Sequence, residues 1–235
     1  MSKPPDRKVT AYDALSRRIL TLDLAPGANL DETQLSADFG LSRTPMREVL
    51  RQLVHEGYAE LREHRGVRVA ELSPQSLRGF FLAAPMVYAA ILRLAALHRT
   101  DTQLRSLEAA QAAFAWALGS GMAADRALAN VEFHRITGDM AQNQYLTPSF
   151  HRLLVDHARI SMTFYQPGSS AQADSVATAS AQHNAMIAAI AARDADRAAQ
   201  LAHDHWQLSR HEIARFVMPT PLDEALGAPP AEATA

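Results

Sequence analysis

The sequence predicts a mainly α-helical protein in two parts, a small N-terminal domain and a larger bundle of six to seven helices. Short helical and strand-like patterns alternate up to residue 72, whereas apolar residues follow a helical period alone from there to about residue 217. The dipeptide Ser73-Pro74 marks the boundary between the two patterns. Of the 235 residues, 48% are apolar and 20% are charged, and these values are typical of a folded globular chain.

Residues 9–72 form the N-terminal domain, which begins with two helices. The spacing of apolar residues predicts the first helix over about 9–23. Asp31 is expected to cap the second helix, with Gln34 as its capping-box partner. Gly40 is expected to end this helix.

A third helix and a hairpin complete the N-terminal domain. Ser42 is the expected N-cap, and Pro45 suits the first helical turn because its missing N–H costs little there. After Gly57 the apolar period switches to two, which predicts short strands over 58–63 and 67–71. Helix, helix, tight turn, helix and two-stranded hairpin is the order of a winged helix-turn-helix.

The C-terminal domain is expected to span residues 73–217 and to be entirely helical. Breaks in the pattern give six helices, or seven if Pro85 interrupts the first. Residues 1–8 are expected to be a flexible terminus, and the proline-rich residues 218–235 a disordered tail.

The third helix carries a row of basic side chains. Arg43, Arg47 and Arg51 are four residues apart and share one helix face, opposite the apolar face. Such a helix can lie in the major groove of DNA, where the planar fork of arginine matches the O6 and N7 atoms of guanine. Ser42 and Thr44 are expected to contact phosphate at the helix N-terminus.

The expected hairpin is a second basic element. Arg65 and Arg68 flank Gly66, so the hairpin can act as a wing that contacts an adjacent groove or the DNA backbone. The competing interpretation of the helix is a solvated arginine face paired with Glu48 and Glu56. The order of the elements and the basic wing favour DNA binding.

Charge and terminal segments restrict the function classes. The formal net charge is −2, and residues 1–72 contain 11 basic and 11 acidic side chains, so nucleic-acid binding must depend on where the charges lie. The N-terminus has no apolar signal region, and no run of eighteen apolar residues occurs. We therefore expect a cytoplasmic protein without membrane association. The absence of cysteine excludes disulfides and thiolate metal sites.

The segment Ile19–Val69 resembles the winged helix of the GntR superfamily of bacterial transcription regulators. The residues that carry the resemblance are Ile19-Leu20, Leu24, Pro26-Gly27, Leu30, Glu32, Leu35, Gly40-Leu41-Ser42-Arg43-Thr44-Pro45, Arg47-Glu48, Leu50, Leu53, Glu56-Gly57, Gly66-Val67 and Val69. The resemblance implies that Arg43 and Arg47 read bases and that Gly66 places the wing tip in the minor groove. Thr33 departs from it, because some members carry a DNA-contacting arginine there.

Three histidines stand out in the C-terminal domain. His134 follows Asn130 by four residues, so both project from one helix face. His183 and His205 lie on two later helices, and imidazoles from three helices can converge in the core of a bundle. Three imidazole nitrogens and one amide oxygen would leave coordination positions for water or a ligand. The histidines expected to be exposed, or satisfied in the core, are His151, His157, His203 and His211.

Residues 74–217 resemble the FCD ligand-binding domain of the fatty-acid-regulator-like branch of GntR proteins. The matching segments are Phe133-His134-Arg135, Gln142-Asn143-Gln144-Tyr145-Leu146, His183, Ile190, Asp194 and His205. Metal-binding members use an aspartate and three histidines, so the resemblance assigns His134, His183 and His205 to a metal and places Asn130 at the aspartate position. The amide is uncharged. We therefore expect a divalent metal, zinc or nickel, to be held, but more weakly than by a site with the aspartate. The extra positive charge should favour a small carboxylate effector.

These features predict a transcription regulator, a repressor, that binds a palindromic double-stranded operator as a homodimer. An alternative is a metal-free regulator that binds a bulkier ligand such as an acyl-CoA, which Asn130 favours and the three histidines oppose. A metal-dependent hydrolase is disfavoured because Glu132 faces away from His134 and no His-Glu-x-x-His motif occurs, so we expect no enzyme. A purely architectural DNA-binding protein would leave the C-terminal histidines unexplained.

Overall fold

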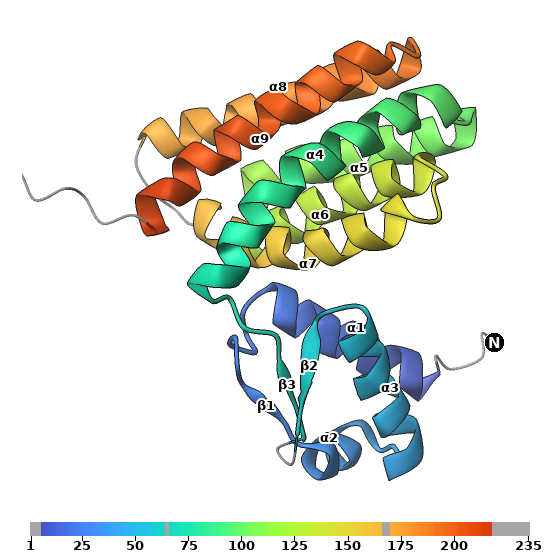
Figure 1. Cartoon of the computed structure of the whole chain (residues 1–235), viewed down its shortest axis with the longest axis vertical. Helices are drawn as coiled ribbons and strands as arrows, with labels where there is room; N and C mark the ends of the chain where they lie inside the picture. The colour runs from blue at the N-terminus through green and yellow to red at the C-terminus, as the bar shows by residue number, and fades with distance from the viewer. Residues whose placement is uncertain (1–5, 64–65, 166–169, 218–235) are drawn as a thin grey trace, which may run out of the picture.

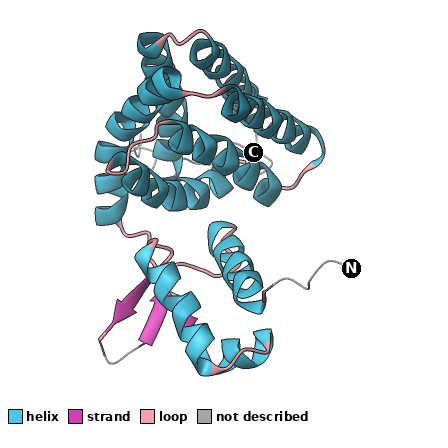
Figure 2. Ribbon diagram, turned by 90° about the vertical axis from the view of Figure 1, so that its right-hand side faces the viewer, coloured by secondary structure: helices cyan, strands magenta, loops and turns pink. Residues whose placement is uncertain are grey.

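The computed structural model describes residues 6–63, 66–165 and 170–217. Figure 1 shows a small domain with a sheet next to a larger domain of packed helices. In the view turned by 90° (Figure 2), the strands again lie in the small domain alone. The predicted fold class is confirmed. The expected tail at 218–235 and most of the expected flexible N-terminus lie outside the described residues.

The described part of the N-terminal domain has three helices and a three-stranded antiparallel sheet. Its elements are α1 (Arg7–Leu20), β1 (Asn29–Leu30), α2 (Glu32–Phe39), α3 (Arg43–His55), β2 (Ala59–Arg62) and β3 (Gly66–Val69). The strand order is β1-β3-β2, with Val67 opposite both Leu30 and Leu61. The sequence predicted the β2–β3 hairpin but missed β1, because two residues are too few to show a period of two.

Helix α1 differs from its prediction at both ends. The side chain of Asp6 accepts a hydrogen bond from the backbone N–H of Lys8 (2.9 Å), so the helix begins inside the segment expected to be flexible. It ends at Leu20 instead of residue 23, because Leu22 has a φ of 63°, outside the helical region.

The caps of α2 and α3 follow the predicted pattern in part. Asp31 accepts hydrogen bonds from the backbone N–H groups of Thr33 (2.7 Å) and Gln34 (2.9 Å). The Gln34 side chain donates to Asp38 instead of returning to the N-cap, so the predicted capping box does not form. Gly40 ends α2 with a φ of 60°, and Ser42 is the N-cap of α3 without a side-chain hydrogen bond.

One apolar core sets the orientation of α3. Leu15 and Ile19 of α1 are fully buried with Val49 and Leu53 of α3, and Val69 of β3 closes the cluster. Because these positions occupy one face of α3, the opposite face with its arginines points away from the domain.

The described C-terminal domain contains six helices. They are α4 (Pro74–His98), α5 (Asp101–Ser120), α6 (Ala123–Met140), α7 (Leu146–Phe164), α8 (Ser170–Ala191) and α9 (Ala195–Val217). Pro85 does not split α4. The helix packs against α6, α7, α8 and α9, and this packing offsets the hydrogen bond that a proline removes.

Helix α4 is long and apolar enough to cross a membrane by length and composition, and it is the one such helix in the described residues. Its Phe80, Tyr88, Ile91 and Leu92 are buried in the main core of the bundle. The core helix of a soluble protein passes the same test, and these contacts identify α4 as a core helix.

Helix α7 joins the two domains. Leu20 of α1 packs against Val155 and Ala158 of α7 in a small apolar cluster. Arg159 of α7, whose side chain is fully buried, donates a hydrogen bond to the carbonyl oxygen of Ala70, just after β3. The N-terminal domain is thus held against the bundle by both apolar and polar contacts.

Candidate nucleic-acid interface and metal centre

The outer face of α3 presents the predicted DNA-contacting side chains to solvent. Arg43, Thr44, Arg47 and Arg51 are exposed, and so is Ser42 at the N-cap. The structure therefore brings all the predicted helix residues to one open surface. Whether they contact DNA remains a prediction.

Arg47 is held by a carboxylate from the neighbouring helix. Its Nε and Nη2 atoms donate to Oε2 and Oε1 of Glu32, at 2.9 Å and 2.8 Å. These bonds lower the pKa of Glu32, and the charges of Arg43 and Arg51 lower it further. The bidentate pair fixes the guanidinium between α2 and α3, so Glu32 is a positioning residue. The sequence analysis named Glu32 in the GntR resemblance but did not predict this role.

Within the described residues, Glu48 and Glu56 form no ion pair with Arg43, Arg47 or Arg51. Glu48 pairs with Lys8 of α1, at 2.6 Å between Nζ and Oε2. Glu56 accepts hydrogen bonds from Tyr12 and Gln52. The two carboxylates are therefore engaged away from the arginine row.

Two of the predicted contact residues of the hairpin, Gly66 and Arg68, lie within the described residues. Gly66 is exposed at the start of β3 with a φ of 75°, which suits a tight wing tip. Arg68 is only 27% exposed and pairs with Glu60 (2.6 Å) and Glu71 (2.7 Å). These two carboxylates anchor Arg68 within the sheet. Arg65 lies outside the described residues.

The three predicted histidines converge in the bundle core. His134 of α6, His183 of α8 and His205 of α9 are all buried, and one ring nitrogen from each lies within 4.8 Å of the others. Their ring centres are 4.8 to 5.4 Å apart. The prediction that helices far apart in sequence bring these imidazoles together is confirmed.

Several polar atoms in this cluster have no hydrogen-bond partner within the described residues. They are both ring nitrogens of His134 and Nε2 of His183. One turn before His134 on α6, Oδ1 of Asn130 also has no partner, and Asn130 is only 1% exposed. A buried polar atom without a partner costs about 1–3 kcal/mol. Because several occur together, and all are metal-binding atom types, the residues fit a divalent cation.

Two glutamines orient the imidazole rings of His183 and His205. Oε1 of Gln111 on α5 lies 3.0 Å from Nδ1 of His183, and Oε1 of Gln182 lies 2.8 Å from Nδ1 of His205. An amide oxygen only accepts, so each Nδ1 carries the proton and each Nε2 keeps its lone pair for a metal. Sequence reasoning missed both glutamines. Gln182 precedes His183, but nothing in the pattern marks Gln111.

His157 of α7 joins the cluster. Its ring centre lies 5.2 Å from that of His134, and its Nδ1 lies 2.6 Å from the hydroxyl of Tyr88 on α4. The sequence predicted a histidine that is exposed or satisfied in the core, and this hydrogen bond fits the second case. The sequence did not place His157 beside His134. A fourth imidazole therefore borders the centre.

Burial keeps these imidazoles neutral. Desolvation lowers the pKa of His134 and His183 well below the ordinary value, and neighbouring histidines add to the effect. It lowers the pKa of His157 to about 3 and that of His205 to about 4. Neutral imidazole is the form that binds metals, so the centre is ready for a cation at neutral pH.

Comparison with known protein families agrees with the winged helix-turn-helix of the N-terminal domain and with the helical C-terminal domain. Residues 7–69 match the bacterial regulatory proteins of the gntR family, and residues 86–208 match the FCD domain. The chain belongs to the GntR family. It is a transcriptional regulator of the GntR type with a helix-turn-helix DNA-binding domain and an FCD domain, and the families and relatives that it matches are regulators, not enzymes.

Similar proteins are regulators of the same kind. The repressor RspR of Escherichia coli is 33% identical over 97 residues, 41% of this chain and 42% of RspR. A regulator from an unstable DNA locus of Streptomyces ambofaciens is 44% identical over 63 residues, 27% of each chain. The chain thus spans under half the length of these two relatives.

Two solved structures share the fold. E. coli McbR/YncC has a TM-score of 0.75 at 18% identity, covering 91% of this chain and 99% of that one. A GntR regulator structure from Rhodococcus sp. RHA1 has a TM-score of 0.67 at 16% identity, covering 88% and 97%. Both structures are similar to this GntR protein in overall fold.

Proposed function

We propose that this GntR protein is a cytoplasmic repressor whose affinity for DNA is controlled by a small carboxylate bound at a divalent metal, zinc or nickel. The observation that carries the proposal is the buried centre formed by His134, His183 and His205, in which several metal-binding atoms have no partner in the described part of the chain. The exposed arginine face of α3 supplies the DNA-binding element.

Asn130 would be the fourth protein group at the metal. Its amide oxygen is neutral, so the centre keeps one more positive charge than an aspartate would leave. Three histidine nitrogens suffice for zinc or nickel, and such an ion, when bound, supplies a Lewis acid that accepts an anionic oxygen. A small carboxylate effector therefore suits the charge of the centre.

The first test is metal content. Freshly purified, untagged protein is expected to contain about one metal per chain by elemental mass spectrometry, and His134→Ala is expected to lose it. His203→Ala is the matched control, because His203 is an exposed histidine of α9. Absence of metal from the unaltered protein would contradict the metal-dependent part of the proposal.

A metal-free regulator that binds a bulkier ligand such as an acyl-CoA is the second candidate, and the neutral side chain of Asn130 is the observation that favours it. Metal-depleted protein separates the two. If an acyl-CoA binds it and shifts its affinity for DNA, while added zinc has no effect, the second candidate replaces the first.

We further propose that the protein acts as a homodimer on a palindromic operator. Leu82 and Met86 lie one turn apart on α4 and are 70% and 75% exposed, and we propose that this face contacts a second copy. Leu82→Glu with Met86→Glu is expected to give monomers by light scattering, whereas Ala109→Glu on the exposed face of α5 leaves the dimer intact. An unchanged mass in the double variant would exclude this face.

A further inference from the structure

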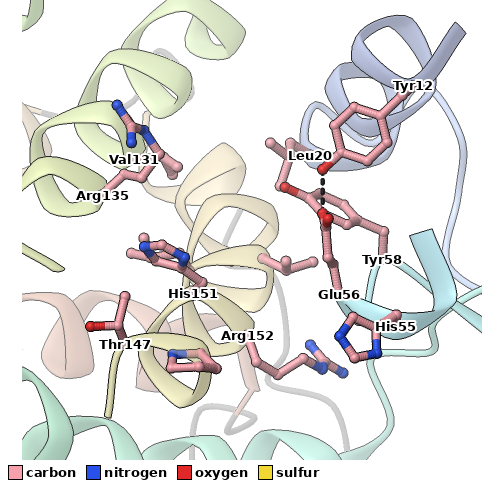
Figure 3. A pocket seen from close by; sticks show the side chains of 13 residues that line it. Tyr12, Leu20, His55, Glu56, Tyr58, Val131, Arg135, Thr147, His151 and Arg152 are labelled. Atoms are coloured by element: carbon pink, nitrogen blue, oxygen red, sulfur yellow. Dashed lines mark hydrogen bonds between the residues drawn. The ribbon is translucent and has the colours of Figure 1, made fainter. Parts of the chain in front are cut away.

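A cavity lies between the two domains, and its lining contains none of the three histidines of the centre. It has a volume of about 530 Å³ and is bordered by α1, the end of α3, α6 and α7 (Figure 3). This is within the size range of small-molecule sites. Its apolar wall is formed by Leu20, Val131, Leu154 and Val155.

The polar wall of the cavity is basic in character. Arg152 of α7 extends toward His55 and Glu56 at the end of α3 (Figure 3). The carboxylate of Glu56 already accepts two hydrogen bonds, from the hydroxyl of Tyr12 and from the amide of Gln52. Within the described residues neither Arg152 nor His55 forms an ion pair with Glu56, and both side chains line the cavity.

Gly57 allows Arg152 to reach this position. A Cβ atom on Gly57 would lie 2.0 Å from both Cδ and Nε of Arg152, so the arginine side chain fills the space that any other residue would occupy. Gly57 also has a φ of 85°, a backbone conformation that favours glycine independently of the contact with Arg152. The close approach directs the guanidinium from the bundle to the corner between α3 and β2.

Arg152 has one weak ion pair within the described residues, with Asp156 of its own helix at 3.3 Å. A carboxylate ligand can bind a guanidinium through two parallel hydrogen bonds, which is stronger and more specific than a single contact. The apolar wall beside it suits a hydrocarbon or aromatic body, and the aromatic ring of Tyr58 lies on the same cavity.

We propose that this interdomain cavity is a second effector site, which binds an organic monocarboxylate with an apolar body. Arg152 holds the carboxylate, His55 adds a donor, and the apolar wall covers the body. The ligand contacts both domains, so it binds best to one arrangement of α3 relative to the bundle and changes DNA affinity by favouring that arrangement. The site does not depend on the proposed metal, because its lining contains none of the three metal histidines.

Calorimetry with benzoate and octanoate tests the proposal on full-length protein treated with a chelator. At least one of them is expected to bind with a Kd of about 1 mM or tighter, and its neutral amide, benzamide or octanamide, at least about tenfold more weakly. Arg152→Met keeps the packing of the aliphatic part of the side chain. It is expected to weaken binding of the carboxylate by about tenfold. Arg152→Lys keeps the positive charge but loses the planar guanidinium, so its affinity for the carboxylate should lie between those of the unaltered protein and Arg152→Met.

Two controls locate the binding. Arg105→Met on the exposed surface of α5 and His134→Ala at the histidine centre are both expected to leave carboxylate affinity unchanged. Absence of binding by both carboxylates, equal affinity for acid and amide, or full binding by Arg152→Met would each overturn the proposal. Binding abolished by His134→Ala alone would place the carboxylate at the histidine centre instead.

Discussion

The buried guanidinium of Arg159 on α7 donates a hydrogen bond to the carbonyl oxygen of Ala70, at the point where the chain leaves the N-terminal sheet. It also bonds to Asp156 one turn earlier, at 3.1 Å. Two residues before Arg159 on the same helix, His157 borders the histidine centre. The polypeptide that connects the domains is therefore fixed to the helix that borders the proposed sensor.

Arg159→Met is expected to destabilise the protein, because it leaves the Ala70 carbonyl without its donor and removes one of the two arginine partners of Asp156. The cost should be about 1–3 kcal/mol, which lowers the Tm of a chain of this size by roughly 5 °C. Calorimetry measures this loss, with Arg105→Met as the exposed control. Equal melting of Arg159→Met and the unaltered protein would show that the junction contributes nothing.

Glu32→Gln is expected to reduce the sequence specificity of DNA binding without abolishing binding. The carboxylate fixes both donor edges of Arg47, and a neutral amide holds a guanidinium less firmly while repelling phosphate less. Affinity for random DNA should rise, and the ratio of operator to random affinity should fall by about tenfold. Fluorescence anisotropy at fixed salt measures both. A ratio equal to that of the unaltered protein would show that the pair has no part in base reading.

Asn130→Asp is expected to change stability in opposite directions with and without metal. A buried carboxylate near the histidines should raise zinc affinity about tenfold or more, measured by competition with a chelator. In metal-free protein the same charge lacks a partner, so the free energy of unfolding should fall by about 1–3 kcal/mol. Asn184→Asp, on the exposed surface of α8, is the control and should change neither quantity.

Acid is expected to unfold the metal-free protein. The pKa values of His157 and His205 in the folded chain, about 3 and about 4, lie below the ordinary value of about 6.5. Below pH 6.5 the unfolded chain therefore binds protons that the folded chain does not. Burial of each of these two imidazoles should therefore lower the free energy of unfolding by about 2 kcal/mol at pH 5. Above about pH 7 neither should lower it.

Urea unfolding at about pH 7.5, 6 and 5 measures this loss. In His157→Gln one of the titrating groups is absent, so the difference in stability between neutral and acidic pH should be smaller by about 2 kcal/mol. A stability that is flat with pH in the unaltered protein would contradict the burial of neutral imidazoles.

The sequence predicted the features that depend on local period. The face of α3 that bears Arg43, Arg47 and Arg51 follows from the helical repeat. His134, His183 and His205 could be brought together because each lies on a helix of a predicted bundle. The arginine face is a local pattern, which does not depend on how distant elements pack. The choice of the three histidines also rested on the resemblance to the FCD domain.

The features that depend on packing between distant segments were not predicted. Gln111 meets His183 across 72 positions, and Arg159 meets Ala70 across 89. Nothing near either residue in sequence indicates its partner. The pair of Glu32 and Arg47 is similar, because it depends on the angle between two short helices.

The position of helix α7 between the two domains predicts where regulatory mutations should occur. Within about two turns it contacts Gly57 through Arg152, the histidine cluster through His157 and the interdomain connection through Arg159. A screen for variants that still occupy the operator but no longer respond to inducer should therefore recover changes along α7, including positions that contact neither DNA nor effector. Such alleles would be dominant over the unaltered gene if mixed dimers form.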